Sequence, residues 1–417
     1  MILQNETIPP SASQPLEPTP TLTLQVVRDF AAIEHLEGPF DSAVERLAGP
    51  IYMSFGWLKV WWRHYGDDAA LRVYLFWHQS ELVGIIPCYI QTLGAGPLSI
   101  RIARLVGANV PPKTFNPPLD PRFADEAVSL MIGSLFGGDR CHLLSLGPVS
   151  RQWPAWASFR DPQSPRGAPA VVSQYARRDV HTVFKLPATV PEYLEQLEPS
   201  ERKSRMKRLR QLERSHRISE DVISDATQVK SAFEEFSALH AQHWKRMGRG
   251  GHFEAWPQAE AYNLDLVLEQ ARHGRVRFYR LLADDRVISS RYTYRMGGTL
   301  FSELPARAIG EPWDKLGIGV SSLIKFTGQA INEGVLAIDS GLGSYEHKSS
   351  LGGDEIEVGV WRVFNASWFG RVQARLCLLA SQAMLFVFQK LWYRRILPRL
   401  PPGVRRTQGL YWLRYDY

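Results

Sequence analysis

The 417 residues of the chain exceed one ordinary domain of roughly 100–200 residues, so two or three domains are expected. Hydrophobic residues make up 45% and charged residues 22%, which supplies a buried core and excludes a chain that is disordered throughout. The net charge is +7, with +6 in residues 201–217 and +6 in residues 390–417. The rest of the chain therefore carries −5, the total less these two segments, which argues against a general nucleic-acid coat protein.

Cysteine usage and the N-terminal residues indicate a cytoplasmic protein. Cys88, Cys141 and Cys377 lie far apart and make no Cys-x-x-Cys or cysteine–histidine spacing, which argues against a disulfide framework and a zinc ribbon. A reducing compartment suits such a chain. Residues 1–21 are rich in Pro, Ser and Thr and lack the basic start and apolar run of a signal peptide, so we expect a disordered tail.

One arrangement of elements is predicted twice, about 205 residues apart. In the first half, the apolar periodicity predicts a helix over 57–65 and two hairpin strands over 71–77 and 82–90. In the second half, it predicts a helix over 262–271, hairpin strands over 276–282 and 287–295, and a third strand over 299–304. A single repeat at this distance indicates duplication of a whole domain.

Each set of strands is followed by a long loop, a helix and one more strand. These segments are 109–121, 124–135 and 141–146 in the first half, and 305–314, 319–332 and 335–339 in the second. Antiparallel strands followed by a helix and a further strand predict a mixed domain. The predicted fold class is therefore α+β, with two duplicated domains that each have a largely antiparallel sheet flanked by helices.

The strongest candidate for a ligand-binding segment is the predicted helix start at Gly317-Ile318-Gly319. Glycine lets the backbone approach a ligand, and the first N–H groups of a helix have no acceptor within the helix. Together with the positive end of the helix macrodipole, they predict an anion site suited to a pyrophosphate. Lys315 adds a charge-assisted contact. The alternative is a tight turn that precedes an ordinary helix.

The order of these elements resembles the BioF2-like (CelD-type) branch of the GNAT acetyltransferase superfamily, which is related to FemAB-type transferases. The resemblance extends over roughly residues 50–360. The segments that carry it are SFGWLKVWWRHYG at 54–66, ELVGIIPCYI at 81–90, RLVGA at 104–108, SERKSRMKRLRQLER at 200–214, LHAQHWKRMGRGGHF at 239–253 and IDSGLGSYEHKSSLGG at 338–353.

The resemblance implies tandem duplicated GNAT-like domains. We expect an N-terminal domain over 22–180, an acyl-CoA-binding C-terminal domain over 181–365 and a basic helical extension over 366–417. Acetyl-CoA or another acyl-CoA is then the donor. Its expected binding residues are Lys315, Gly317, Gly319, Val320 and Lys348.

The family's core strand ends with an Asp, followed by a Gly four residues later and then by a Tyr-Lys pair. Asp339, Gly343 and Lys348 match these spacings, but His347 occupies the tyrosine position and Tyr345 lies two residues earlier. This departure leaves no direct assignment of a catalytic tyrosine, and Tyr345 is instead expected to bind substrate.

The candidate catalytic residues are Glu303, Asp339 and His347. A partly buried glutamate or histidine titrates near neutrality, so Glu303 and His347 are candidates for the general base or acid. The alternative for Glu303 is a strand carboxylate that faces solvent or pairs with an arginine. The alternative for His347 is a structural histidine. No Ser-His-Asp or Cys-His pattern is readable, which favours direct transfer without a covalent enzyme intermediate.

Two further segments contain candidate binding residues. His240 and His243 share a helix face, but no third ligand follows at suitable spacing, so we expect no metal. The resemblance favours a substrate-channel role for Trp244 and Arg249. The helix over 201–217 is strongly basic: it either exposes a solvated face or attracts a polyanion such as the CoA phosphates, RNA or an anionic membrane.

The segment 366–398 is predicted to be helical, with fourteen uncharged residues between Arg375 and Lys390. A membrane span needs about twenty apolar residues, so a transmembrane helix is disfavoured. We favour a helix packed on the protein or on a partner chain over a peripheral helix at the inner membrane face.

The function predicted from these features is a cytoplasmic acyl-CoA-dependent N- or O-acyltransferase. The resemblance implies a small-molecule or saccharide acceptor and a role in bacterial exopolysaccharide or cell-envelope biosynthesis. Two alternatives stay open. One is a FemAB-like transferase that uses aminoacyl-tRNA, the single case in which nucleic acid would be a partner. The other is a non-catalytic GNAT-like module that docks at a membrane.

Overall fold

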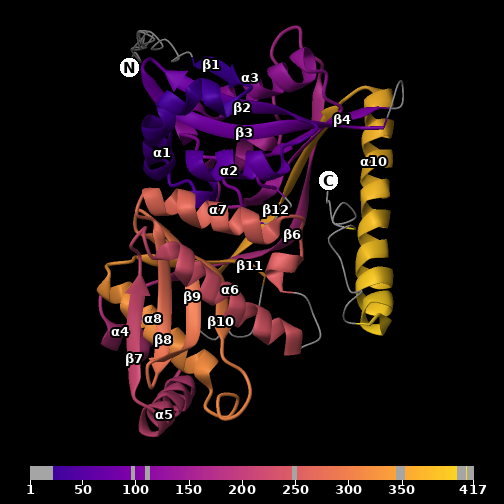
Figure 1. Ribbon diagram of the computed structural model, residues 1–417. Coiled ribbons are helices and arrows are strands. Elements are labelled where there is room, and N and C mark those ends of the chain that lie inside the picture. Colours follow the sequence, from indigo (N-terminus) through magenta and orange to yellow (C-terminus); the bar gives the residue numbers. More distant parts are fainter. Residues whose placement is uncertain are drawn as a thin grey trace, which may run out of the picture.

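The computed structural model describes residues 22–94, 99–108, 113–246, 251–343, 353–401 and 410. Twelve strands form one continuous sheet in these residues, in the order β1-β2-β3-β4-β5-β12-β6-β11-β10-β9-β8-β7 (Figure 1). The strands are β1 (Thr23–Val27), β2 (Ala69–His78), β3 (Glu81–Leu93), β4 (Ile100–Leu105), β5 (Leu143–Ser150), β6 (Val171–Lys185), β7 (Ile218–Ile223), β8 (Val276–Ala283), β9 (Arg286–Met296), β10 (Thr299–Arg307), β11 (Ala337–Leu342) and β12 (Asp354–Asn365).

Helices cover both faces of this sheet (Figure 1). They are α1 (Glu37–Arg46), α2 (Phe55–Tyr65), α3 (Ala124–Ile132), α4 (Val190–Gln196), α5 (Pro199–Ser215), α6 (Val229–Arg246), α7 (Ala259–Arg272), α8 (Ile318–Asn332), α10 (Trp368–Phe386) and its continuation η8 (Val387–Ile396). The predicted α+β class is confirmed.

The predicted repeat of elements is also confirmed. In the first half, β2, β3 and β4 form an antiparallel meander, and α3 then leads to β5, which is parallel to β4. In the second half, β8, β9 and β10 form the same meander, and α8 leads to β11, which is parallel to β10. One boundary was wrong: the segment 305–314 was expected to be a loop, but β10 continues to Arg307 because Pro305, Ala306 and Arg307 still pair with β9.

The two halves share their sheet, which the sequence did not predict. β12 comes late in the chain but pairs antiparallel with β5 of the first half and along its whole length with β6. β6 in turn pairs with β11 of the second half. The expected domain boundary between residues 180 and 181 lies inside β6. In Figure 1, β6 and β12 run between the two halves.

Aromatic packing also joins the halves. Helix α2 buries Phe55, Trp57 and Trp61, because apolar residues recur on one side of WLKVWW at helical spacing. The ring of Trp57 packs edge-on against Tyr294 of β9, with 5.0–5.1 Å between its centroid and those of Tyr294 and Tyr52. Burial of one such side chain contributes about 1.5–3 kcal/mol. The helix of the first half therefore forms part of the core of the second.

A buried ion pair links the same two halves. Arg275 Nη1 donates to Asp41 Oδ2 at 2.6 Å, and their side chains are only 12% and 9% exposed. Asp41 also accepts the backbone N–H of Phe55 at 2.7 Å, which anchors the start of α2. Both charged groups are thus removed from water, and the charge of each is balanced by the other.

We expect Arg275→Ala to lower the free energy of unfolding by about 3–5 kcal/mol, because it leaves the Asp41 carboxylate buried without its cation. Urea unfolding followed by circular dichroism measures the change. The control is Arg217→Ala, which removes a pair with Asp285 whose two side chains are 71% and 76% exposed, and we expect little effect. Equal loss from both variants would contradict the assignment.

Candidate functional site

The strands β10 and β11 diverge after a short stretch of pairing. Only Thr299, Leu300 and Phe301 pair with Ala337, Ile338 and Asp339. Beyond Phe301, β10 stays with β9 as far as Arg307, while β11 stays with β6. The sheet therefore opens between these two strands, and we call this opening the second-half gap.

Helix α8 begins at the outer end of the gap. Its N-cap, Gly317, has a φ of +63°, which glycine adopts without strain, and no side chain of the described residues caps the helix. The first turn contains no acidic residue. The amide of Val320 bonds to the carbonyl oxygen of Gly317 at 3.1 Å, so the amides that precede this bond, of Ile318 and Gly319, point out of the helix end.

Two arginines flank this helix start. A Cβ placed on Gly317 would lie 3.0 Å from Cδ of Arg208 in α5, and one placed on Gly319 would lie 3.8 Å from Cδ of Arg307 in β10. Arg208 and Arg307 thus add positive charge where the macrodipole is already positive. Lys315 is 77% exposed and pairs with Glu311 at 3.0 Å. The arrangement suits an anion with two or more phosphate oxygens.

The corresponding region of the first half is built differently. Residues 115–120 run across the space where β4 ends: Phe115 N–H donates to Pro148 O at 2.7 Å, and Ile85 N–H donates to Pro118 O at 2.8 Å. The first turn of α3 carries Asp125 and Glu126, and Glu126 accepts the N–H of Leu22. In the described residues, an open gap beside a positive helix start occurs in the second half alone.

Glu303 lies on β10 at the gap. Its side chain is 6% exposed. Tyr52 Oη donates to Glu303 Oε1 at 3.2 Å, and the ammonium of Lys113 binds Oε2. The expected alternative for Glu303 was a carboxylate that faces solvent or pairs with an arginine. The side chain does not face solvent, and the cation that pairs with it is a lysine of the first half. Burial and the charge of Glu303 raise the pKa of Tyr52 far above its usual range, so Tyr52 stays a hydrogen-bond donor.

Asp339 lies on the opposite side of the gap in a second buried cluster. His181 Nε2 lies 3.0 Å from Asp339 Oδ2, and His181 Nδ1 lies 2.8 Å from Thr114 Oγ1. Asp339 Oδ1 accepts the backbone N–H of Gly341 at 2.8 Å. All three side chains are buried. The carboxylate thus fixes the imidazole, whose other nitrogen meets a hydroxyl, an arrangement able to hold a proton at a defined place.

A histidine cluster lies beside the outer part of β10. His240 on α6 is buried, with Nδ1 3.3 Å from Pro305 O and Nε2 3.1 Å from His252 Nδ1. The Trp244 ring packs against His252 at 5.2 Å between centroids. Burial, together with the neighbouring His252, lowers the pKa of His240 to about 4. The His240 imidazole is therefore neutral near pH 7.

The described residues include one group of side chains that is close enough to share a metal ion: Glu37, Glu269 and His273. It lies on α1 and at the end of α7, and His273 Nε2 already lies 3.1 Å from Glu37 Oε1. None of these three residues belongs to β10 or β11, the strands that border the second-half gap.

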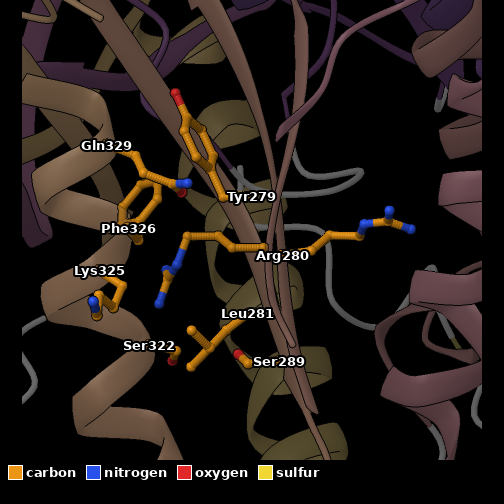
Figure 2. Close-up of a pocket in the computed structure, with 9 residues that line it drawn as sticks. Tyr279, Arg280, Leu281, Ser289, Ser322, Lys325, Phe326 and Gln329 are labelled. Atoms are coloured by element: carbon orange, nitrogen blue, oxygen red, sulfur yellow. The ribbon is translucent and has the colours of Figure 1, made fainter. Parts of the chain in front are cut away.

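A small hollow lies between α8 and the strands β8 and β9 (Figure 2). Arg291 donates to Ser302 Oγ at 3.0 Å, and its guanidinium lies 4.8 Å from the centroid of the Phe326 ring. Burial lowers the pKa of Arg291 to about 10. None of the residues that line the hollow belongs to β10 or β11, so it is separate from the gap.

The structure brings together the predicted residues Glu303 and Asp339, and it places Gly317, Gly319 and Val320 at one helix start. Trp244 lies near the outer part of β10, because its ring packs against His240 and His252 there. Four predicted residues lie outside the described residues: Arg249, Tyr345, His347 and Lys348. Sequence reasoning missed Tyr52, Lys113 and Thr114, because no spacing links the first half to a gap in the second. It also missed His181 and Arg307, because their places beside Asp339 and the start of α8 depend on how the strands are arranged in the fold.

Comparison with known proteins finds a matching family model and solved structures of similar fold. Residues 199–349 match the family model described as an acetyltransferase (GNAT) domain. The structure is similar to the crystal structure of FemX, with a TM-score of 0.56 and 9% identity over 78% of this chain and 94% of that one. The fold is GNAT-like. No curated protein matches the sequence.

A second solved structure, a conserved protein of unknown function from Bacteroides thetaiotaomicron, has a TM-score of 0.50 and 10% identity over 82% of this chain and 100% of that one. At these identities the two solved structures speak for the GNAT-like fold alone. They do not single out the BioF2-like branch within it.

We expect the free energy of unfolding to decrease as the pH is lowered, because His240 gains a proton more readily in the unfolded chain than in the folded one. The imidazole protonates near 6.5 when unfolded but only near 4 when folded, so protons favour the unfolded chain between these values. From about pH 7 to about pH 5, the wild type should lose about 2 kcal/mol more than His240→Gln. Urea unfolding at both pH values measures this difference, and identical slopes would contradict it.

Proposed function

We propose that this chain is an acyl-CoA-dependent N- or O-acyltransferase of the BioF2-like (CelD-type) kind. The donor is acetyl-CoA or another acyl-CoA, and the acceptor is an amine or hydroxyl of a small molecule or a saccharide. The observation that carries the proposal is the open, positively charged start of α8 beside diverging β10 and β11. The GNAT family match over residues 199–349 supports it.

The donor is held by its diphosphate. The amides of Ile318 and Gly319 donate to phosphate oxygens, and the guanidinium groups of Arg208 and Arg307 neutralise their charge. Arg307 lies at the outer end of β10, and Glu303 lies four residues further in along the same strand. A thioester that follows β10 inward from the helix start thus reaches the buried carboxylates.

Transfer is direct in this proposal. The acceptor nitrogen or oxygen attacks the thioester carbonyl carbon, the C–S bond breaks, and CoA leaves as the thiolate. Glu303 accepts the acceptor's proton, while Lys113 and Tyr52 hold the carboxylate in place. Asp339 positions His181 on the other side of the gap. His347, Lys348, Tyr345 and Arg249 keep their expected roles in the proposal.

We expect Gly319→Glu to abolish stabilisation by acetyl-CoA, because it places a carboxylate where the diphosphate would bind, and the nearest atom to the new Cβ is at an ordinary distance of 3.8 Å. A ligand at about 100 times its dissociation constant stabilises the wild type by about 2.7 kcal/mol. Differential scanning fluorimetry with acetyl-CoA, longer acyl-CoAs and free CoA measures the shift.

The control for this experiment is Ser80→Glu, which adds the same charge in the exposed turn between β2 and β3 and should keep the shift. Absence of a shift in the wild type with every thioester would defeat the acyl-CoA proposal. It would favour the aminoacyl-tRNA alternative if tRNA bound instead, with an affinity that falls steeply with salt. That alternative rests on the exposed basic residues of α5, which are Lys203, Lys207, Arg208, Arg210 and Arg214.

We expect Glu303→Gln to lower turnover by about 10²–10⁴-fold and to leave acetyl-CoA binding unchanged, because the amide cannot accept the acceptor's proton. Release of free CoA thiol in the presence of amine and sugar acceptors measures turnover, and the fluorimetric shift measures binding. The matched control is Glu195→Gln, on the exposed surface of α4. Full activity of Glu303→Gln would remove Glu303 from the mechanism.

The proposal places the enzyme in the cytoplasm, where acyl-CoA is available. The acceptor class and the role in exopolysaccharide or cell-envelope biosynthesis rest on the sequence resemblance.

A further inference from the structure

Helix α10 and its continuation η8 form one long helix at the side of the molecule. Helical structure extends without a break from Trp368 to Arg399, which is long and apolar enough to cross a membrane by length and composition. The helix predicted over 366–398 is confirmed, and it is longer than the fourteen-residue apolar run on which a transmembrane helix was disfavoured. Figure 1 shows α10 beside β4 with its long axis alongside the body of the protein.

One narrow face of this helix packs on the protein. Its buried residues recur every three, four or seven positions, so they lie on one side, and they are mostly small: Gly370, Ala374, Cys377, Ser381 and Phe388. Cys377 packs against Ile102 and Leu143 of the sheet. The expectation that the helix packs on the protein thus holds for this side only.

The opposite face is apolar and exposed. Trp368, Leu379 and Phe386 are separated by eleven and seven residues, which are close to three and two helical turns, so they lie in one line. Phe369 and Leu376 are seven residues apart, so they form a second line beside the first one. These five side chains are 58–78% exposed. A continuous apolar surface of this kind marks an interaction site.

The charge of the segment identifies the partner. Residues 366–401 contain no Asp or Glu and six basic residues, and all six are exposed: Arg371, Arg375, Lys390, Arg394, Arg395 and Arg399. An apolar face bordered by cations along a single helix is complementary to a surface that offers hydrocarbon below a layer of negative charge. A protein partner would require acidic groups arranged around an equally long apolar groove.

We propose that the exposed face of α10 and η8 docks the protein on an anionic lipid bilayer, with the helix axis in the plane of the interface. The aromatic and leucine side chains enter the acyl-chain boundary, and the arginines and Lys390 bind lipid phosphates.

The helix lies on the bilayer and does not cross it. Its packed face covers the sheet around Cys377, where the charges of the buried Arg104 and Arg362 act on the cysteine. A spanning helix would carry this polar region into hydrocarbon, which is costly. With one side on the protein and the other on lipid, both faces are satisfied. This role is independent of the acyl-CoA proposal.

Vesicle flotation of the full chain tests the inference. We expect the wild type to float with phosphatidylcholine/phosphatidylglycerol vesicles, to bind phosphatidylcholine alone at least about tenfold more weakly, and to be released by high salt and alkaline carbonate. The triple variant Leu376→Ser/Leu379→Ser/Phe386→Ser should reduce binding about tenfold or more. Arg371→Gln/Arg375→Gln/Arg394→Gln should remove the preference for anionic lipid.

The control is Leu336→Ser, which changes a leucine that is 69% exposed and lies outside the helix, and it should leave flotation intact. Thermal midpoints and the acetyl-CoA shift of all variants should match the wild type, because the altered side chains do not pack on the core. Wild type that does not float, or a triple variant that floats equally well, overturns the inference. So does retention after the carbonate wash, which indicates a span, or a wild-type dimer that the triple variant makes monomeric, which indicates a second copy as the partner.

Discussion

The backbone pairing of β12 is the interaction on which the rest of the structure depends. This strand completes the first half by pairing with β5, and it pairs along its whole length with β6, which adjoins β11 of the second half. Backbone hydrogen bonds thus run without interruption from one half to the other, and the halves cannot rotate freely. The buried pair of Asp41 and Arg275 and the packing of Trp57 on Tyr294 reinforce this fixed orientation.

With the halves fixed, the two copies of one architecture differ in the charge at their helix starts. Both have a helix between parallel strands, but Asp125 and Glu126 at the start of α3 repel anions, whereas the start of α8 lies beside Arg208 and Arg307. The difference lies in a few side chains and in the path of residues 115–120, which cross the gap of the first half. The α5 helix contributes to this contrast, since its apolar edge packs near Ile318 and so carries Arg208 to the helix start.

The sequence predicted local structure well because periodicity and turn residues act locally. The hairpins, α2, α8 and the repeat followed from it. It could not predict that β12 returns to the middle of the sheet, since pairing partners of a strand are set by distant segments. His181 and Lys113 were missed for the same reason. The exposure of α10 was missed because the periodicity of the sequence shows two apolar faces and does not say which one is covered.

The segment that closes the gap of the first half also supplies side chains to the second-half gap. Residues 115–120 occupy the space between β3 and β5, and this placement carries the two residues before them, Lys113 and Thr114, across to Glu303 and His181. Had the first gap stayed open for a ligand, this segment would lie elsewhere, and Glu303 would be a buried carboxylate without its cation, which is costly. Closure of the gap in the first half and placement of Lys113 and Thr114 at the second-half gap thus depend on one and the same segment.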